Sequence, residues 1–171
     1  PLMNKSIAGL YPPGSTIKPI VALSALENNV VSTNTTVECK GAIELYGHKY
    51  HCWKEKGHRF LKLREGIKQS CDIYFYEVAR RLGVDRLAVT AKKFGLGNKV
   101  FDILNEEQAG LVPTTKWKLK NIGKGWVLGE TLLAGIGQGY FQSTPMQLCL
   151  MTAQLANGGY KIKPRIIDDK D

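Results

Sequence analysis

Apolar residues recur at helical spacing in several stretches of the chain, and turn residues separate these stretches. The first stretch covers residues 17–26 and is rich in alanine. Ser15 precedes it as a favourable N-cap, and Pro19 is tolerated because it falls in the first turn. Residues 1–14 are expected to form a loop. The pattern therefore predicts a helix that begins near Ser15 and ends at residues 28–29.

Helical spacing returns over residues 61–82, where Ser70-Cys71-Asp72 interrupts it. Ser and Asp favour helix starts over helix interiors, so we expect a short helix, a break and a second helix over 73–82. Further turn signals predict three more helices, namely 83–94, a short one that starts at 113–115, and 143–155.

Two other stretches lack clear periodicity. Residues 30–63 alternate only weakly, which favours a short hairpin or an irregular loop, and residues 123–142 contain six glycines and are expected to be loop close to other backbone. Residues 160–164 are expected to begin a strand. The balance predicts an α+β fold that is mostly α within these residues.

Length and composition fit one globular domain, with 171 residues, 43% hydrophobic and 23% charged. No run approaches the roughly 18 apolar residues of a membrane span, and residues 1–5 carry no signal-peptide core. The chain starts without Met and stops on polar residues, so we interpret it as a fragment of a larger protein. The net charge of +9 is spread along the chain without a dominant stripe, which favours a solvated basic surface over nucleic-acid binding.

The clearest candidate chemistry is the pair Ser15 and Lys18. A Ser hydroxyl is a poor nucleophile unless a base takes its proton, and a spacing of three places both side chains on one helix face. A Lys in a partly apolar site can lose its charge and serve as that base. S-x-x-K also occurs by chance in helices, where the Ser caps the helix and the Lys is exposed to solvent. The surrounding segment is more specific: Tyr11-Pro12-Pro13-Gly14-Ser15-Thr16-Ile17-Lys18-Pro19.

That segment resembles the nucleophile segment of class B penicillin-binding proteins, the serine DD-transpeptidases of peptidoglycan synthesis. The downstream chain is similar to the same family, and in particular to its elongation-type members. The matching segments are Asp72-Ile73-Tyr74-Phe75-Tyr76-Glu77-Val78-Ala79, Gly135-Ile136-Gly137-Gln138-Gly139-Tyr140 and Ser143-Thr144-Pro145-Met146-Gln147. The resemblance covers nearly the whole chain. It implies the helical part of the serine β-lactamase/DD-transpeptidase-like fold, with most of the central sheet missing.

The resemblance also assigns roles to residues. The family uses three motifs, S-x-x-K, S-x-N and K-T-G. Ser15 and Lys18 match the first as nucleophile and base, and Ser70 and Asp72 match the second, with Asp in place of Asn as in elongation-type members. K-T-G has no counterpart here, because Gly123-Lys124-Gly125-Trp126 precedes the G-Q-G segment whereas K-T-G follows it in the family. Residues 1–171 are therefore expected to be a partial transpeptidase domain that is inactive alone.

The same resemblance implies partners and a location. The expected substrates are peptidoglycan stem peptides, β-lactams would acylate the same serine, and a SEDS-family glycosyltransferase would be the partner of the full-length protein. The chain would be a periplasmic domain whose inner-membrane anchor lies upstream. A β-lactamase, a β-lactam sensor and a non-catalytic zinc-binding module are the alternatives.

Three of the four cysteines share a polar region with all three histidines. Thiolates and imidazole together suit a tetrahedral zinc site, and the candidate ligands are Cys39, Cys52, His58 and Cys71 within residues 30–71. Their spacings of 13, 6 and 13 residues match no standard zinc-finger pattern, so a Cys39–Cys52 disulfide or free thiols stay open. Resemblance to elongation-type members with a mixed Asp, His and Cys site favours structural zinc.

Other candidates have simpler interpretations. His48 and His51 are expected on a surface loop, and Cys149 is expected to fill the core within the last helix. Trp53, with the other two tryptophans, is expected to pack.

Overall fold

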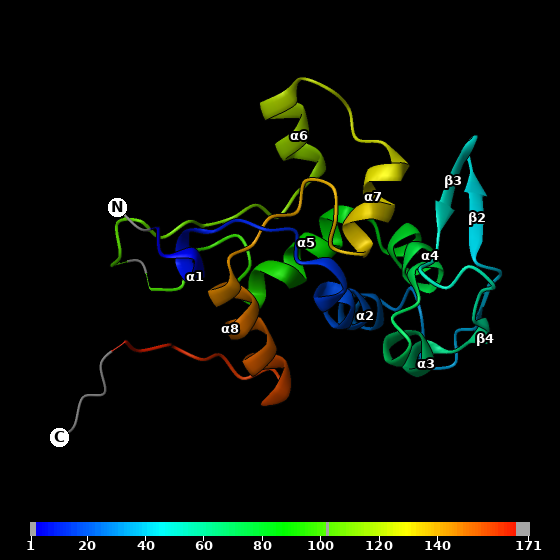
Figure 1. Cartoon of the computed structure of the whole chain (residues 1–171), viewed down its shortest axis with the longest axis horizontal. Coiled ribbons are helices and arrows are strands. Elements are labelled where there is room, and N and C mark those ends of the chain that lie inside the picture. The colour runs from blue at the N-terminus through cyan, green and yellow to red at the C-terminus, as the bar shows by residue number, and fades with distance from the viewer. Residues whose placement is uncertain (1–2, 102, 167–171) are drawn as a thin grey trace.

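The computed structural model describes residues 3–101 and 103–166, and its helices surround one central helix, α2 (Figure 1). Two short antiparallel sheets lie at one edge, next to α4. None of the helices in this described part is long and apolar enough to span a lipid bilayer. In chain order the elements are α1 Lys5–Ala8, the 3₁₀ turn η1 Gly14–Ile17, α2 Lys18–Glu27, β1 Val37–Cys39, β2 Ala42–Leu45, β3 His48–His51, β4 Arg59–Leu61, α3 Leu63–Lys68, α4 Asp72–Leu82, α5 Val84–Lys93, α6 Thr115–Ile122, α7 Leu128–Gly135 and α8 Pro145–Ala156.

The central helix α2 is buried on most sides because α4 and α5 pack against it. Its small and branched side chains suit this position, and Ile20 and Val21 are fully buried. Pro19 stands in its first turn, and the Asn28 side chain donates to the Ser24 carbonyl at its end, 2.8 Å away. The predicted helix over 15–28 is thus confirmed, except that its first turn is 3₁₀.

The weakly periodic stretch folds as two separate two-stranded pairs, β1 with β4 and β2 with β3. In the first pair Cys39 stands opposite Arg59, and in the second Ala42 stands opposite His51. The β2–β3 hairpin rests on α4 through Tyr76, whose ring meets the Tyr50 ring edge-on at 5.6 Å. The expected hairpin is therefore present, with a second strand pair around it.

The break between α3 and α4 falls where the sequence predicts it, at residues 70–71. The cap, however, is Cys71, because its Sγ accepts a hydrogen bond from the Tyr74 backbone N–H at 3.4 Å. Asp72 is already the first helical residue, which leaves its carboxylate available for tertiary contacts.

Three predictions about irregular segments are wrong. Residues 123–142 are not all loop, since α7 lies within them and packs on α4; its Leu residues recur at helical spacing despite the glycines around them. Residues 160–164 form no strand, and residues 1–14 contain the short helix α1, which Asn4 caps. The remaining helices, α5, α6 and α8, match their predicted positions within a few residues.

Two backbone contacts hold the segment around Ser15 in place. Gly14 N–H donates to the Gly137 carbonyl at 2.9 Å, and a Cβ at Gly137 would lie 2.2 Å from the Gly14 oxygen. Tyr11 and Ser143 exchange backbone hydrogen bonds of 2.9 Å in an isolated bridge. The glycine-rich G-I-G-Q-G segment thus supports the turn that carries Ser15, and only glycine allows this approach.

Candidate active site and metal-binding cluster

Ser15 and Lys18 lie one turn apart but in different environments. Ser15 is exposed in the 3₁₀ turn, whereas Lys18 begins α2 and is 2% exposed. In the described part of the chain no hydrogen bond joins the two side chains, because the three bonds of Lys18 Nζ go elsewhere. The candidate nucleophile therefore lies at the surface, one helical turn before a buried cation.

The Lys18 ammonium is bound by the second candidate motif. Its Nζ donates to Asp72 Oδ1 at 2.7 Å, to the Ser70 carbonyl at 2.8 Å and to Ser70 Oγ at 3.0 Å. The Phe75 ring lies beneath it, 5.6 Å from Nζ to the centroid. A buried ammonium must have such partners to offset its lost hydration, and all three N–H donors are used here.

Backbone geometry at Ser70 directs both of its oxygens toward Lys18. Ser70 has φ +48°, a left-handed conformation that costs a non-Gly residue on the order of 1–3 kcal/mol. It follows the end of α3, where its N–H donates to the Ile67 carbonyl at 3.0 Å. The break in the helical pattern thus has a structural role, since it turns Ser70 and Asp72 toward the same cation.

The four candidate metal ligands come together as a buried cluster. One ligand atom from each of Cys39, Cys52, His58 and Cys71 lies within 4.8 Å of all the others. His58 Nδ1 is 3.5 Å from both Cys39 Sγ and Cys52 Sγ, and Cys52 Sγ is 4.0 Å from Cys71 Sγ. A tetrahedral zinc ion with Zn–S bonds of about 2.3 Å requires sulfurs about 3.8 Å apart, so the donor set fits.

Backbone pairing explains how residues so far apart in sequence meet. His58 N–H donates to the Cys39 carbonyl at 3.0 Å, and Cys52 N–H donates to the Gly41 carbonyl at 2.8 Å. Gly57 has φ +73°, and a Cβ there would lie 2.1 Å from the Cys39 oxygen. The close strand crossing therefore needs glycine immediately before His58.

Burial sets the protonation of the cluster. It lowers the pKa of His58, as does the Lys54 ammonium to a smaller extent, which favours the neutral ring whose lone pair could bind a metal. Burial also raises the pKa of the Cys71 thiol, so a metal ion would have to displace its proton. His58 Nε2 is buried and has no hydrogen-bond partner among the described residues.

Some of the remaining sequence predictions are confirmed and others are wrong. His48 and His51 are exposed, as expected, but they lie on the strand β3 and not on a loop, and neither belongs to the four-residue cluster. Cys149 is exposed on α8, so its assignment to the core is wrong. Trp53 was expected to pack, yet 64% of it is exposed and its indole bonds to the Ser70 turn. A Trp in a polar loop directly after Cys52 is the signal that would have indicated this role.

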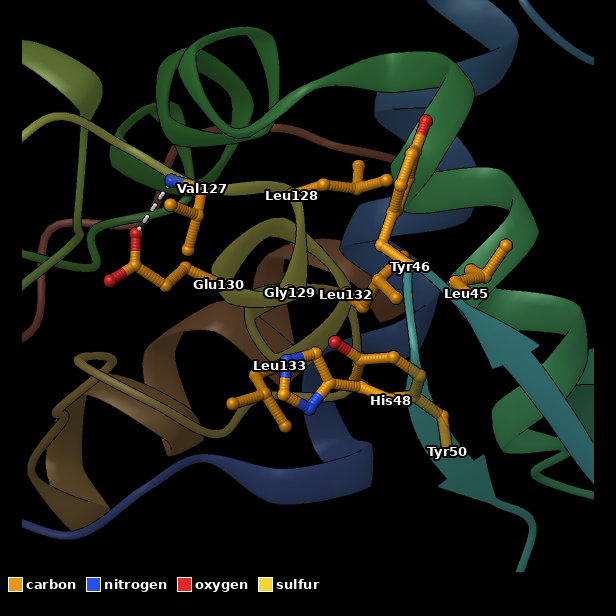
Figure 2. Close-up of a pocket in the computed structure, with 10 residues that line it drawn as sticks. All are labelled: Leu45, Tyr46, His48, Tyr50, Val127, Leu128, Gly129, Glu130, Leu132 and Leu133. Carbon is orange, nitrogen blue, oxygen red and sulfur yellow. Dashed lines mark hydrogen bonds between the residues drawn. The ribbon is translucent and has the colours of Figure 1, made fainter.

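A separate apolar pocket of about 610 Å³ lies between the β2–β3 hairpin and α7 (Figure 2). Leucines of α7 form one wall, and His48 and Tyr50 lie on the other. Glu130 borders it, with one carboxylate oxygen accepting from the Val127 N–H at 3.0 Å. None of the candidate catalytic or metal-binding residues lines this pocket.

Comparison with known proteins identifies the class. The model of the penicillin binding protein transpeptidase domain matches residues 1–171, so the chain belongs to that family. The expected resemblance to class B members, and to penicillin-binding protein 2 among them, is confirmed, as is the predicted fold class.

Individual relatives agree with this assignment. Peptidoglycan D,D-transpeptidase MrdA of Escherichia coli is 41% identical over 98% of this chain. Penicillin-binding protein 2 of Pseudomonas aeruginosa, solved in complex with WCK 5153, superposes with a TM-score of 0.91 at 47% identity, covering 96% of this chain and 38% of that one. Penicillin-binding protein 2 of Helicobacter pylori, solved in complex with MreC, superposes with a TM-score of 0.88 at 40% identity. The match covers 92% of this chain and 30% of that one. The chain spans about a quarter of the length of the curated relatives, 27% for the Escherichia coli protein.

Proposed function

We propose that this chain carries the acylation centre of a peptidoglycan DD-transpeptidase, with Ser15 as nucleophile and Lys18 as base. The observation that supports it most strongly is the buried Lys18 ammonium, held by Ser70 and Asp72 one helical turn after exposed Ser15. The substrates would be the stem peptides of peptidoglycan, and β-lactams would acylate the same hydroxyl.

The roles follow from the contacts. In its neutral form Lys18 Nζ carries a lone pair, which would accept the Ser15 hydroxyl proton as Oγ attacks the D-Ala-D-Ala carbonyl. The carbon–nitrogen bond to the terminal D-Ala then breaks. Ser70 Oγ, 3.0 Å from Nζ, is placed to pass the proton to the leaving amine. An amine of a neighbouring stem peptide attacks the acyl-enzyme, completes the cross-link and frees Ser15.

The oxyanion formed in these steps needs two donors. The Ser15 backbone N–H would supply one, and in the family the edge of the K-T-G strand supplies the other. No K-T-G sequence occurs in these 171 residues. Because loss of one oxyanion donor costs ~10²–10³ in rate, we expect residues 1–171 alone to be acylated at least 100-fold more slowly than a protein that also contains that strand.

The assignment of Ser15 is tested with a fluorescent penicillin on the full-length protein. Ser15→Ala should abolish labelling while the far-ultraviolet circular dichroism stays unchanged. Ser6→Ala, at a serine of α1, is the matched control and should label normally. Normal labelling of Ser15→Ala would exclude Ser15 as the nucleophile.

We propose further that Cys39, Cys52, His58 and Cys71 hold one structural zinc ion. Three thiolates and one imidazole form a soft, fully buried donor set that favours zinc over magnesium or calcium. Four protein ligands leave no position for a substrate or water, so the ion would stabilise the fold and take no chemical step. Its contribution to catalysis would be to hold Cys71, and with it the turn between Ser70 and Asp72.

Elemental analysis tests the zinc assignment. Protein purified without added metal should contain about one zinc per chain, and Cys39→Ser should lower that content. Cys149→Ser is the control, because Cys149 is exposed and outside the cluster. A Cys39–Cys52 disulfide found by mass spectrometry in the purified protein would contradict the assignment.

Location and assembly partners rest on the relatives alone. The Helicobacter pylori structure pairs penicillin-binding protein 2 with MreC. By analogy we propose that the full-length protein works in the periplasm, anchored in the inner membrane, beside MreC and a SEDS-family glycosyltransferase of the elongation machinery.

A further inference from the structure

The exposed Trp53 contacts the Ser70 turn, Asp72 and the His58 ring of the cysteine–histidine cluster. It directly follows Cys52, so the backbone links it to the metal cluster, and its ring lies edge-on to the His58 ring with centroids 5.2 Å apart. With 64% of the residue exposed, burial of its apolar surface contributes little to the fold. Its position is better explained by its polar contacts.

The indole N–H of Trp53 holds the Ser70 turn. Nε1 donates to the Ser70 carbonyl at 3.1 Å and shares its hydrogen with the Gln69 carbonyl at 3.2 Å. The Ser70 oxygen is the same atom that accepts from Lys18 Nζ at 2.8 Å. This bond therefore fixes an acceptor of the catalytic cation at a residue whose left-handed φ of +48° is strained.

The backbone N–H of Trp53 holds the second acceptor. It donates to Asp72 Oδ2 at 3.0 Å, while Asp72 Oδ1 accepts from Lys18 Nζ at 2.7 Å. Trp53 thus orients both the carbonyl and the carboxylate that accept hydrogen bonds from Lys18. Cys71 connects the cluster to the same turn through the chain, and Trp53 provides a second, non-covalent connection.

We infer that Trp53 is a positioning residue for Lys18, which connects the cysteine–histidine cluster to the acylation centre. This inference rests on the proposed function of Ser15 and Lys18. Loss of the indole N–H should release the Ser70 carbonyl and let Lys18 settle in non-productive geometries. Chemistry after substrate binding should then slow, with no change in the binding step itself.

The kinetic test removes the indole N–H in two ways. In the full-length protein, Trp53→Phe removes Nε1–H, and β-(3-benzothienyl)alanine at position 53 replaces it with sulfur while keeping the bicyclic shape. Both should slow acylation by a chromogenic β-lactam about tenfold, as expected for loss of one hydrogen bond to a charged network. The non-covalent binding constant and the metal content should stay unchanged.

Two controls separate this role from a general structural one. 7-Azatryptophan at position 53 keeps the N–H and should restore the wild-type acylation rate. Trp117→Phe makes the same exchange on α6, where the ring packs on Tyr140, and should have no effect. An unchanged acylation rate in Trp53→Phe, or a slower rate explained by lost metal, would overturn the inference.

A second measurement does not depend on catalysis. With ¹⁵N-labelled indoles, Lys18→Ala should shift the Trp53 indole resonance, because both groups donate to the Ser70 carbonyl. The Trp117 resonance should not move. If the wild-type protein is acylated at a residue other than Ser15, the proposed function fails, but the chemical-shift change still tests the role of Trp53. If the Trp53 resonance does not move in Lys18→Ala, only the inference about Trp53 is overturned.

Discussion

At the scale of single residues, the position of Lys18 decides what the site can do. Its side chain is 2% exposed, and removing an ammonium from water is costly unless it is fully hydrogen-bonded. The S-x-x-K spacing predicts a serine beside a lysine, but not the acceptors that lysine finds. Those acceptors come from a turn more than fifty positions later, and only the packing of α2 against α4 brings them close.

Two substitutions at Asp72 should separate its charge from its shape. Asp72→Asn keeps an acceptor oxygen for Lys18 Nζ, and the family's S-x-N motif carries Asn here, so we expect acylation within about tenfold of wild type. Asp72→Ala removes the acceptors of both Lys18 Nζ and the Trp53 N–H. It should lower the free energy of unfolding by about 1–3 kcal/mol in urea titrations.

Glu44→Gln serves as the matched charge control, since Glu44 is exposed on β2. It should leave both acylation and stability at wild-type values. Equal stability of the Asp72→Ala and wild-type proteins would contradict the importance of the carboxylate bonds.

At the scale of elements, the residue pattern predicted a helix correctly where capping residues and apolar spacing agree. It missed a helix where glycines interrupt the apolar spacing. The break at residues 70–71 is predictable because Ser and Asp are poor inside helices. α7 was missed because Gly129 and Gly135 lie within it, although Leu128, Leu132 and Leu133 keep helical spacing. Gly135 is required there, since a Cβ would lie 2.4 Å from the Ala79 Cβ of α4.

The pairing of α6 with α7 should depend on pH through Glu130. Lys118 of α6 is 5% exposed, donates to the Gly125 carbonyl at 2.8 Å and forms an ion pair with Glu130 of α7. Burial opposes ionisation of Glu130, but hydrogen bonds from Lys118 and the Val127 N–H outweigh it and lower its pKa. Glu130→Gln should therefore destabilise the protein by about 1–3 kcal/mol at pH 7.

Because the folded-state pKa of Glu130 lies below its ordinary value of 4.5, this stabilisation is complete above about pH 4.5 and is lost as the pH falls through the folded-state pKa. The stability difference between wild type and Glu130→Gln should accordingly shrink in urea titrations at pH 3. A difference that stays constant from pH 7 to pH 3 would show that Glu130 contributes by packing alone.

At the scale of the whole molecule, the cysteine–histidine cluster and the Ser70 turn were predictable only in part. The identities of Cys39, Cys52, His58 and Cys71 follow from residue type and resemblance, but their spacing matches no standard pattern. Their convergence depends on two strand pairs whose register no alternation in the sequence predicts. The role of Trp53 was missed because tryptophans are usually interpreted by their apolar surface, although its place directly after Cys52 is a signal of that role.

If the proposed zinc ion is bound, its removal should loosen one part of the molecule more than the rest. The strands over residues 37–61 contribute few side chains to the core, whereas α2 and α4 bury most of their residues and α5 buries half. Metal-binding free energy is folding free energy for such a loop, so a chelator should lower the melting temperature of the full-length protein by several degrees. Hydrogen exchange should rise first in residues 37–61 while α2 and α5 stay protected. Cys149→Ser should respond like wild type, and equal exchange with and without chelator would contradict a structural ion.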